Sequence, residues 1–230
     1  MGLNEFFYNG KSTRDFGIYC SGADTYAAPM RKYTAIEIKG KNGLILEDEK
    51  AFSNAALGYK CIIMGDIDNY ERFKAFMASQ SGYKRLEDTF HPDEYREAVM
   101  AESISPAIKG DYDVASFEVV FSAKPQRFLK DGERALSFSG SGNILMNNTL
   151  FDAKPMIRLL GSGTVTINST SFTVTDVSGY VDVDCEEMDV YKGSTNMNNK
   201  FTGSFPVLTS GLNTISSTVA IEIKPRWYTI

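Results

Sequence analysis

Residue types that build catalytic and metal centres are scarce in this sequence. Its 230 residues include one histidine, His91, and three cysteines, Cys20, Cys61 and Cys185. A single histidine leaves most zinc sites and the histidine-dependent acyl-transfer triads without a group they need. The cysteines are widely spaced and form no Cys-x-x-Cys pair, so we expect free, buried thiols in a protein made in a reducing compartment.

Basic clusters and long apolar segments are also lacking. The net charge is −5 and no basic tract occurs, which argues against sequence-independent binding of nucleic acid. No run of about 18 apolar residues is present, so a transmembrane helix is excluded. The N-terminal segment lacks the basic and apolar regions of a secretory signal peptide. We therefore expect a protein that is made in the cytoplasm and binds neither a membrane nor a specific nucleic-acid sequence.

Short β-prone segments, by contrast, are abundant. Apolar and polar residues alternate over residues 114–123 with the period of two of a half-buried strand. A hairpin is predicted where residues 36–39 and 44–46 flank a turn bracketed by Gly40 and Gly43. The predicted strands are 5–8, 16–20, 35–39, 44–46, 59–64, 83–86, 94–101, 114–123, 136–139, 156–160, 164–168, 171–175, 180–185 and 188–192.

One segment has the period of a helix. Between residues 68 and 78 apolar residues recur every three to four positions, which predicts a single amphipathic helix. Asp68 and Glu71 resemble a capping box at its start, and residues 79–82 end it. The helix interrupts an otherwise β-rich half of the chain.

The composition changes near residues 127–132. Charged residues are frequent before this point, whereas serine, threonine, glycine and asparagine dominate after it. We therefore predict a mainly β protein with two domains. Residues 1–129 form a β-barrel- or sandwich-like domain with one helix, and residues 130–230 form a β-sandwich of the jelly-roll type.

The C-terminal residues suggest how the second domain closes. Residues 205–208 and a turn at 210–213 precede an alternating run over 221–228. We expect this region to form a closing hairpin that ends on a full strand. Trp227 lies on the apolar face of that strand and is predicted to belong to the core.

The strongest candidate for a chemical site is an acidic cluster. Two nearby carboxylates can hydrolyse a glycoside or bind a hard cation. Alternatively, Val181, Val183 and Cys185 face the core and the acids between them form a solvated strand face, the interpretation that we favour. The cluster comprises Asp182, Asp184, Glu186, Glu187 and Asp189.

Other candidates also have structural explanations. His91 precedes a proline, and we interpret it as a turn residue with no nucleophile or orienting group nearby. The glycine pairs at 140–142 and 161–163 lack the third glycine and helix of a dinucleotide site, so we expect turns. We assign no catalytic, cofactor-binding or metal-binding residue and no cofactor. Three tyrosines with little pattern around them are candidates for an interface, namely Tyr26, Tyr33 and Tyr59.

The order and spacing of several segments resemble the distal tail protein family of long-tailed phages. No single segment is highly specific, but together they extend over essentially the whole chain. The segments are Phe7–Gly10, Asp15–Gly22, Ile36–Leu44, Arg85–Asp88, Phe117–Leu129, Phe205–Leu208, Gly211–Asn213 and Pro225–Trp227.

The resemblance implies a structural hub of the phage baseplate and not an enzyme. Residues 1–129 are expected to form a homo-hexameric ring around the tail lumen, through which DNA passes, and residues 130–230 a galectin-like sandwich. The ring would join the tail tube protein to the tail tip protein and anchor receptor-binding proteins, in a virion assembled from host-made subunits.

A second hypothesis is a carbohydrate-binding module that contacts the host cell surface through the galectin-like half. It requires polar side chains around an exposed aromatic residue, whereas Trp227, the only tryptophan, is predicted to be buried. A glycosidase that uses the acidic cluster is the weakest hypothesis, because it also needs a cleft and a raised pKa.

Overall fold

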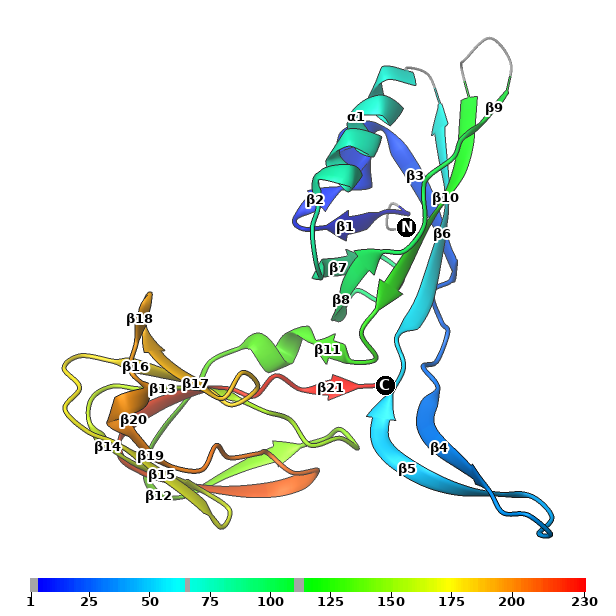
Figure 1. Cartoon of the computed structure of the whole chain (residues 1–230). Coiled ribbons are helices and arrows are strands. Elements are labelled where there is room, and N and C mark those ends of the chain that lie inside the picture. Colours follow the sequence, from blue (N-terminus) through cyan, green and yellow to red (C-terminus); the bar gives the residue numbers. More distant parts are fainter. Residues whose placement is uncertain (1–3, 65–66, 110–113) are drawn as a thin grey trace. The chain divides into compact units, whose positions relative to one another are not determined.

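The computed structural model describes residues 4–64, 67–109 and 114–230 (Figure 1). The chain is mainly β and divides into two compact units, Met1–Arg127 together with Ile230, and Phe128–Thr229. The described residues contain one α-helix, α1 (Ile67–Ser79), as the sequence predicted. None of the helices in the described part of the chain has the length and apolar character needed to span a membrane.

The first unit is a curled antiparallel sheet in the strand order β2-β1-β7-β8-β10-β6-β3, with β9 paired to β10 (Figure 1). Short segments rich in β-branched and aromatic residues form it, separated by turns that contain glycine, asparagine and aspartate. The strands are β1 (Phe6–Tyr8), β2 (Lys11–Ser12), β3 (Ile18–Asp24), β6 (Ala55–Met64), β7 (Lys84–Asp88), β8 (Glu94–Met100), β9 (Ala107–Lys109) and β10 (Val114–Ala123).

The core of the first unit is built from aromatic rings. The predicted alternation on β10 is confirmed, since Phe117, Val119 and Phe121 are all buried. Helix α1 covers this face, and the ring of its Tyr70 lies 5.2 Å from that of Phe117. The ring of Phe121 meets that of Phe6 edge to face at 5.5 Å, a favoured aromatic geometry.

Two local predictions in this unit are wrong. Asp68 lies in the first turn of α1 instead of capping it, and the residue that precedes the helix lies outside the described residues. The strand expected from residue 16 begins at Ile18, because Thr13–Phe16 form a short 3-10 helix that Ser12 caps. Gly17 ends that turn with a left-handed φ of 67°, which favours glycine.

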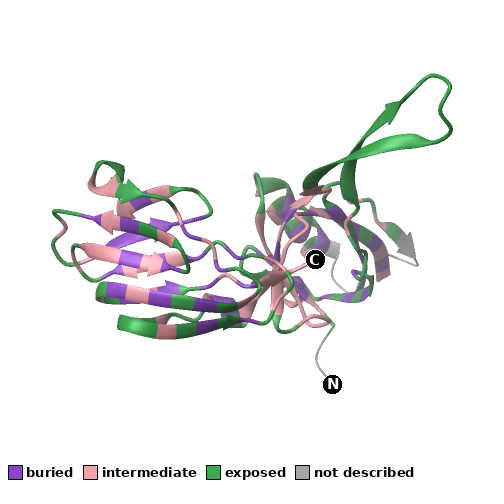
Figure 2. Ribbon diagram, turned by 90° about the horizontal axis from the view of Figure 1, so that it is seen from below, coloured by how far each residue is buried: buried purple, intermediate pink, exposed green. Residues whose placement is uncertain are grey.

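The predicted hairpin is present and is longer than expected. Strands β4 (Arg31–Glu37) and β5 (Leu44–Phe52) form a two-stranded sheet of their own, which we call the arm. Gly40 and Gly43 in its turn both have positive φ. Nearly all residues of the arm are exposed, so it is green along its length in Figure 2.

The second unit is an antiparallel β-sandwich organised by one long strand, β20 (Gly211–Lys224). At Ile223 it pairs with β12 on one side and β13 on the other, and at Ser217 with β12 and β14. The other strands of this sheet are β12 (Leu136–Asn147), β13 (Met156–Leu159), β14 (Gly163–Ile167), β15 (Thr170–Val174), β16 (Val181–Asp184), β17 (Asp189–Lys192), β18 (Thr195–Asn196) and β19 (Phe201–Gly203). Outside it, β11 (Arg127–Leu129) pairs with β21 (Tyr228–Thr229), and Lys130–Glu133 and Asn198–Lys200 form 3-10 helices.

The closing hairpin predicted at the C-terminal end is wrong. Leu208 makes an isolated bridge with Ala153, because β20 has its edges paired with β12, β13 and β14. The alternating run is also not one strand, since Arg226 has a left-handed φ of 57° between β20 and β21. Trp227 is nonetheless buried in the sandwich core, as predicted.

The two glycine pairs differ in structure. Gly161 lies in the connection between β13 and β14, as predicted. Gly140 and Gly142 instead lie within β12, where the register with β20 shifts on both sides of Gly140. Both have positive φ, so this pair forms a β-bulge and not a turn.

The aromatic core gives a first test of the fold. We expect Phe121→Ala to lower the free energy of unfolding by about 3–5 kcal/mol, because the buried ring packs on Phe6, Tyr8 and Tyr59. Phe7→Ala, an exposed phenylalanine on β1, is the matched control and should cost less than about 1 kcal/mol. Urea denaturation measures both, and equal losses would contradict this account of the core.

Candidate functional site

The acidic cluster is not the solvated strand face that the sequence suggested. All four residues of β16 are buried, and Asp182 and Asp184 are each only 5% exposed. Glu186 and Glu187, in the turn after β16, are exposed. The prediction fails because each buried carboxylate is covered by an arginine from another strand or turn.

Asp182 is paired by the strand register. Arg158 on β13 lies directly opposite it, and Glu222 on β20 lies opposite Arg158 on the other side. The guanidinium donates from Nε to Oδ1 at 2.7 Å and from Nη2 to Oδ2 at 2.9 Å. It also lies 4.5 Å above the ring of Tyr180. This bidentate arrangement fixes both carboxylate oxygens.

Asp184 is held by Arg226 from the turn between β20 and β21. Both guanidinium nitrogens donate to its two oxygens at 2.7 Å, and the backbone amides of Glu186 and Glu187 donate to Oδ1. Burial alone favours the neutral acid, but the hydrogen bonds and charge of Arg226 outweigh it and lower the pKa of Asp184. Asp184 is therefore an ionised structural partner and does not have the raised pKa of a general acid.

A small cavity lies beside Arg158 and Asp182. Its volume of about 60 Å³ is far below the roughly 300 Å³ at which pockets for small ligands begin. Asp189 accepts hydrogen bonds from Asn196 and Asn198. Within the described ranges no group of three acidic, histidine or cysteine side chains is placed to hold a metal ion. The cluster is best explained as structural.

The Asp184–Arg226 pair gives a second prediction. Arg226→Met should lower the free energy of unfolding at pH 7 by about 3–5 kcal/mol, because it leaves a buried carboxylate without its cation. The wild type has the full stabilisation above the aspartate pKa of the unfolded chain, about 3.9, and loses it as pH falls through the lower folded pKa.

In the variant, the desolvated carboxyl favours its protonated form, so the stability difference from wild type should narrow as pH falls from 7 towards 3. Lys224→Met, which removes an exposed cation on β20, is the control and should change little. Urea denaturation across this pH range measures both variants. A pH-independent difference would refute the assignment of the loss to Asp184.

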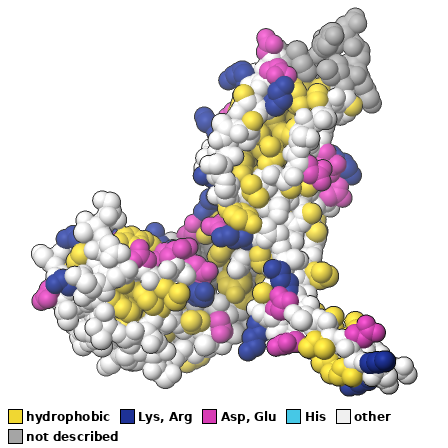
Figure 3. Space-filling model, viewed as in Figure 1, with side chains coloured by type: hydrophobic (Ala, Val, Ile, Leu, Met, Phe, Trp, Pro, Cys, Tyr) yellow, Lys and Arg dark blue, Asp and Glu magenta, His cyan; other side chains and the backbone are white. Residues whose placement is uncertain are grey.

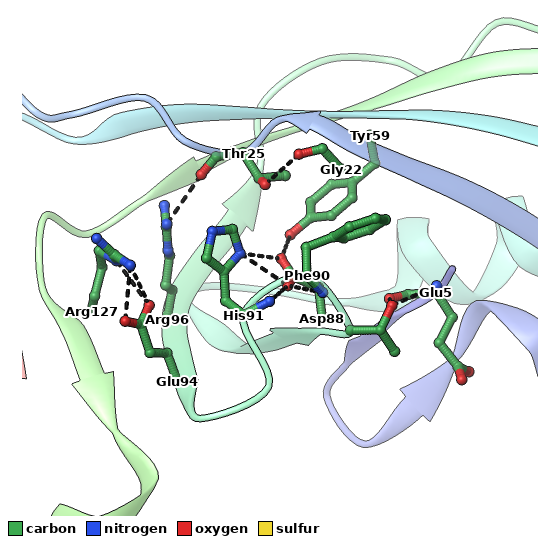
Figure 4. A network of polar contacts seen from close by, with 11 residues as sticks. Glu5, Gly22, Thr25, Tyr59, Asp88, Phe90, His91, Glu94, Arg96 and Arg127 are labelled. Atoms are coloured by element: carbon green, nitrogen blue, oxygen red, sulfur yellow. Dashed lines mark hydrogen bonds and ion pairs between the residues drawn. The ribbon is translucent and has the colours of Figure 1, made fainter. Parts of the chain in front are cut away.

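A second polar network lies in the first unit, around His91 (Figure 4). The imidazole is about 10% exposed, and its Nδ1 lies 3.1 Å from Oδ1 of Asp88. Asp88 also accepts from the backbone amides of Phe90 and His91, and from the hydroxyl of Tyr59 at 2.6 Å. The prediction that no orienting group lies near His91 is therefore wrong, since Asp88 is that group.

The network has no reactive member that a substrate can reach. Tyr59 is buried, so it is not the interface residue that the sequence suggested. Burial and the charge of Asp88 raise the pKa of Tyr59 well above its usual value, which keeps the phenol protonated as a donor. The adjoining cavity measures about 10 Å³, room for about one water molecule.

What this network holds is the segment that leads into the arm. Arg96 donates to the backbone oxygen of Thr25 at 3.1 Å (Figure 4). The ring of Tyr26 lies 4.6 Å from that of His91. A Cβ at Gly22 would lie only 2.2 Å from the ring of Phe90, so the two segments are in close contact. We call residues 22–26 and 53–54 the base of the arm.

The other side of the base is also fixed. Asn54 donates to the hydroxyl of Tyr83 at 2.7 Å and to Oγ of Ser122 at 2.8 Å. The backbone amide of Ser53 donates to the oxygen of Met30, which closes the hairpin at its foot. The exposed arm therefore emerges from a base that is hydrogen-bonded on both sides.

An open groove lies next to this base, on the outer side of β6 and β10. Its volume is about 510 Å³, large enough to receive side chains of another molecule. Small residues form much of its lining, which also includes Glu118 and Asp24, and Asp24 is paired with Lys60 at 2.8 Å. The lining residues are Ala23, Asp24, Tyr26, Ala27, Ala56, Gly58, Glu118 and Val120.

The close contact at Gly22 gives a third prediction. Gly22→Ala should destabilise the protein by about 1–3 kcal/mol, because the added methyl group overlaps the Phe90 ring. The backbone of Gly22 does not have positive φ, so the effect is steric. In the double variant with Phe90→Ala the combined loss should be smaller than the sum of the single losses, as measured by thermal and urea unfolding. Strict additivity would show that the two residues do not clash.

This fold, a curled antiparallel sheet covered by one helix and followed by a β-sandwich, is similar to that of solved phage hub and baseplate proteins. The chain matches the crystal structure of the SPP1 Dit (gp 19.1) protein, which is described as a paradigm of the hub adsorption apparatus in phages that infect Gram-positive hosts. That match has a TM-score of 0.71 and 14% identity, and covers 95% of this chain and 96% of that one.

Two structures of the phage P2 baseplate in its activated conformation, with Ca and with Sr, also match. Their TM-scores are 0.57 and 0.56 at 10% identity, and the matches cover 97% and 96% of this chain and 98% of each of those chains. No protein-family model and no curated protein matches the sequence. The predicted resemblance to distal tail proteins is thus confirmed in the fold.

Proposed function

We propose that the chain is a structural component of a phage tail tip, in which six copies form a ring that joins the tail tube protein to the tail tip protein. Residues 1–129 form the ring around a lumen for DNA, and residues 130–230 form a galectin-like domain that anchors receptor-binding proteins. The subunits are made in the host cytoplasm and act in the virion. The likeness to hub and baseplate chains over nearly the whole length supports this role.

The observation that carries the proposal is the arm. Its strand register places Ala35 opposite Leu46 and Glu37 opposite Leu44 on one face, and Ile36 opposite Ile45 on the other. Tyr33, Leu44 and Leu46 are exposed on the first face, as are Ile36 and Ile45 on the second. Isolated two-stranded hairpins are marginally stable in water, so an arm that is apolar on both faces needs a partner.

A second copy of the chain fits as that partner. A closed ring requires a heterologous interface, in which one surface of a subunit contacts a different surface of the next. The turn of the arm carries Lys39 and Lys41, and the groove beside the base carries Asp24 and Glu118. Apolar side chains gather on the arm in Figure 3, together with both basic and acidic ones. We place the lysine-bearing turn of each arm at the base of the next subunit, next to Glu118, because Asp24 already has Lys60 as its partner.

The charge of the chain suits a channel that releases DNA. The net charge is −5 and the sequence has no basic tract, so a ring of such subunits offers few contacts that would retain phosphate groups. The alternative of a carbohydrate-binding module gains no support from the second unit. Its only tryptophan is buried, and the cavity beside Arg158 is too small for a sugar ring.

Native mass spectrometry at micromolar concentration tests the ring. We expect six copies for the wild type, and a shift to monomers for Leu46→Asp, which places a charge on an apolar face of the arm. Met188→Asp, at an exposed apolar residue of the second unit, is the matched control and should retain the ring. Circular dichroism checks that each variant is folded. A wild type that stays monomeric at every concentration rules out the ring, and an unaffected Leu46→Asp ring rules out the arm as its interface.

A further inference from the structure

Cys20 and Cys61 are brought together by the fold. They are directly opposed partners on the antiparallel strands β3 and β6, although 41 positions separate them in the chain. Their Sγ atoms lie 3.1 Å apart, and both side chains are buried. This proximity could not be predicted from the sequence, because the two cysteines show no motif spacing.

The backbone geometry suits a covalent bond between them. Directly opposed residues of antiparallel strands have Cα atoms about 4.5–5.5 Å apart. A disulfide accepts Cα separations of about 4.4–6.8 Å and brings its sulfur atoms to about 2.05 Å. The sulfur atoms here therefore need to approach by only about 1 Å. No movement of the strands is required.

The pair also has an asymmetric environment that suits the reaction. The hydrogen bond shared with Cys61 lowers the pKa of Cys20 against the opposing effect of burial, and the contact with the hydroxyl of Thr13 also lowers it. The same interaction raises the pKa of Cys61, which thus remains the proton donor. In contrast, burial raises the pKa of Cys185 to about 12, and that thiol lies in the other unit. Cys185 is therefore an internal control.

We propose that Cys20 and Cys61 form a reversible disulfide when the protein meets a mild oxidant such as a peroxide. The bond would cross-link β3 to β6, the strands that precede and follow the arm in the chain. The Cys20 thiolate attacks one peroxide oxygen, which gives a sulfenic acid and hydroxide. The sulfur of Cys61 then attacks the sulfenic sulfur, and the hydroxyl group leaves as water. Overall, two thiols and one hydrogen peroxide give one disulfide and two water molecules, and the thiols supply both electrons.

The cross-link has a defined structural effect. The arm, residues 31–52, lies between the two cysteines in the chain, so the disulfide closes a covalent loop around it. The closed loop lowers the conformational entropy of the unfolded chain, which stabilises the folded protein relative to it. Because the bond joins strands that are already paired, we expect no change in the fold itself.

Thiol counting and peptide mapping test the proposal on the full-length chain. After hydrogen peroxide treatment, removal of peroxide and denaturation, titratable thiols should fall from three to one, with Cys185 still free. The intact mass should drop by two hydrogen atoms, and proteolysis should yield a peptide pair joined through Cys20 and Cys61. Dithiothreitol should restore all three thiols.

Matched variants and melting temperatures complete the test. Oxidation should raise the melting temperature of the wild type and of Cys185→Ser by roughly 5–10 °C, and that of Cys20→Ser not at all. If a variant fails to fold, peptide mapping of the oxidised wild type still tests whether Cys20 and Cys61 are joined. The proposal is overturned if three thiols persist, if the cross-link involves Cys185 or a second chain, or if Cys20 is oxidised to a sulfinic acid while Cys61 stays a thiol.

Discussion

The carboxylate of Asp88 is the interaction on which the organisation of the first unit depends. It accepts hydrogen bonds from the β7–β8 turn itself, from the imidazole of His91 and from Tyr59 on β6. These bonds fix the turn against which Gly22 and Tyr26 pack at the base of the arm. A hairpin without a core of its own cannot set its own direction, so its position must be imposed at its base. This small network therefore fixes the point at which the arm leaves the first unit.

Local patterns in the sequence predicted the elements of the fold well. The alternation at Phe117, Val119 and Phe121 identified β10 and its buried face, and the change of period identified α1. Gly40 and Gly43 identified the turn of the arm. These features succeed because they depend on the nearest residues in the chain. The predicted end of the sandwich failed, because the pairing of β20 with three other strands depends on distant ones.

The same distinction explains what was missed at the candidate sites. The alternation on β16 indicated that Asp182 and Asp184 point away from the hydrophobic core. It did not indicate that arginine side chains cover them on that face. Arg158 and Arg226 lie 24 and 42 positions from the aspartates that they pair, so the strand register brings the first pair together and the turn after β20 the second. The role of Asp88 could have been predicted from the sequence. An aspartate three residues before His91 can accept hydrogen bonds from the backbone amides of its own turn.

The double pairing of β20 has a mechanical consequence. A strand that is hydrogen-bonded along both edges can slide out only if bonds on both sides break together. A pull on the chain beyond Lys224 is therefore shared by many bonds loaded in parallel, whereas an edge strand such as β19 can peel away one bond at a time. The second unit should thus resist force applied through its C-terminal segment much better than force applied through β19.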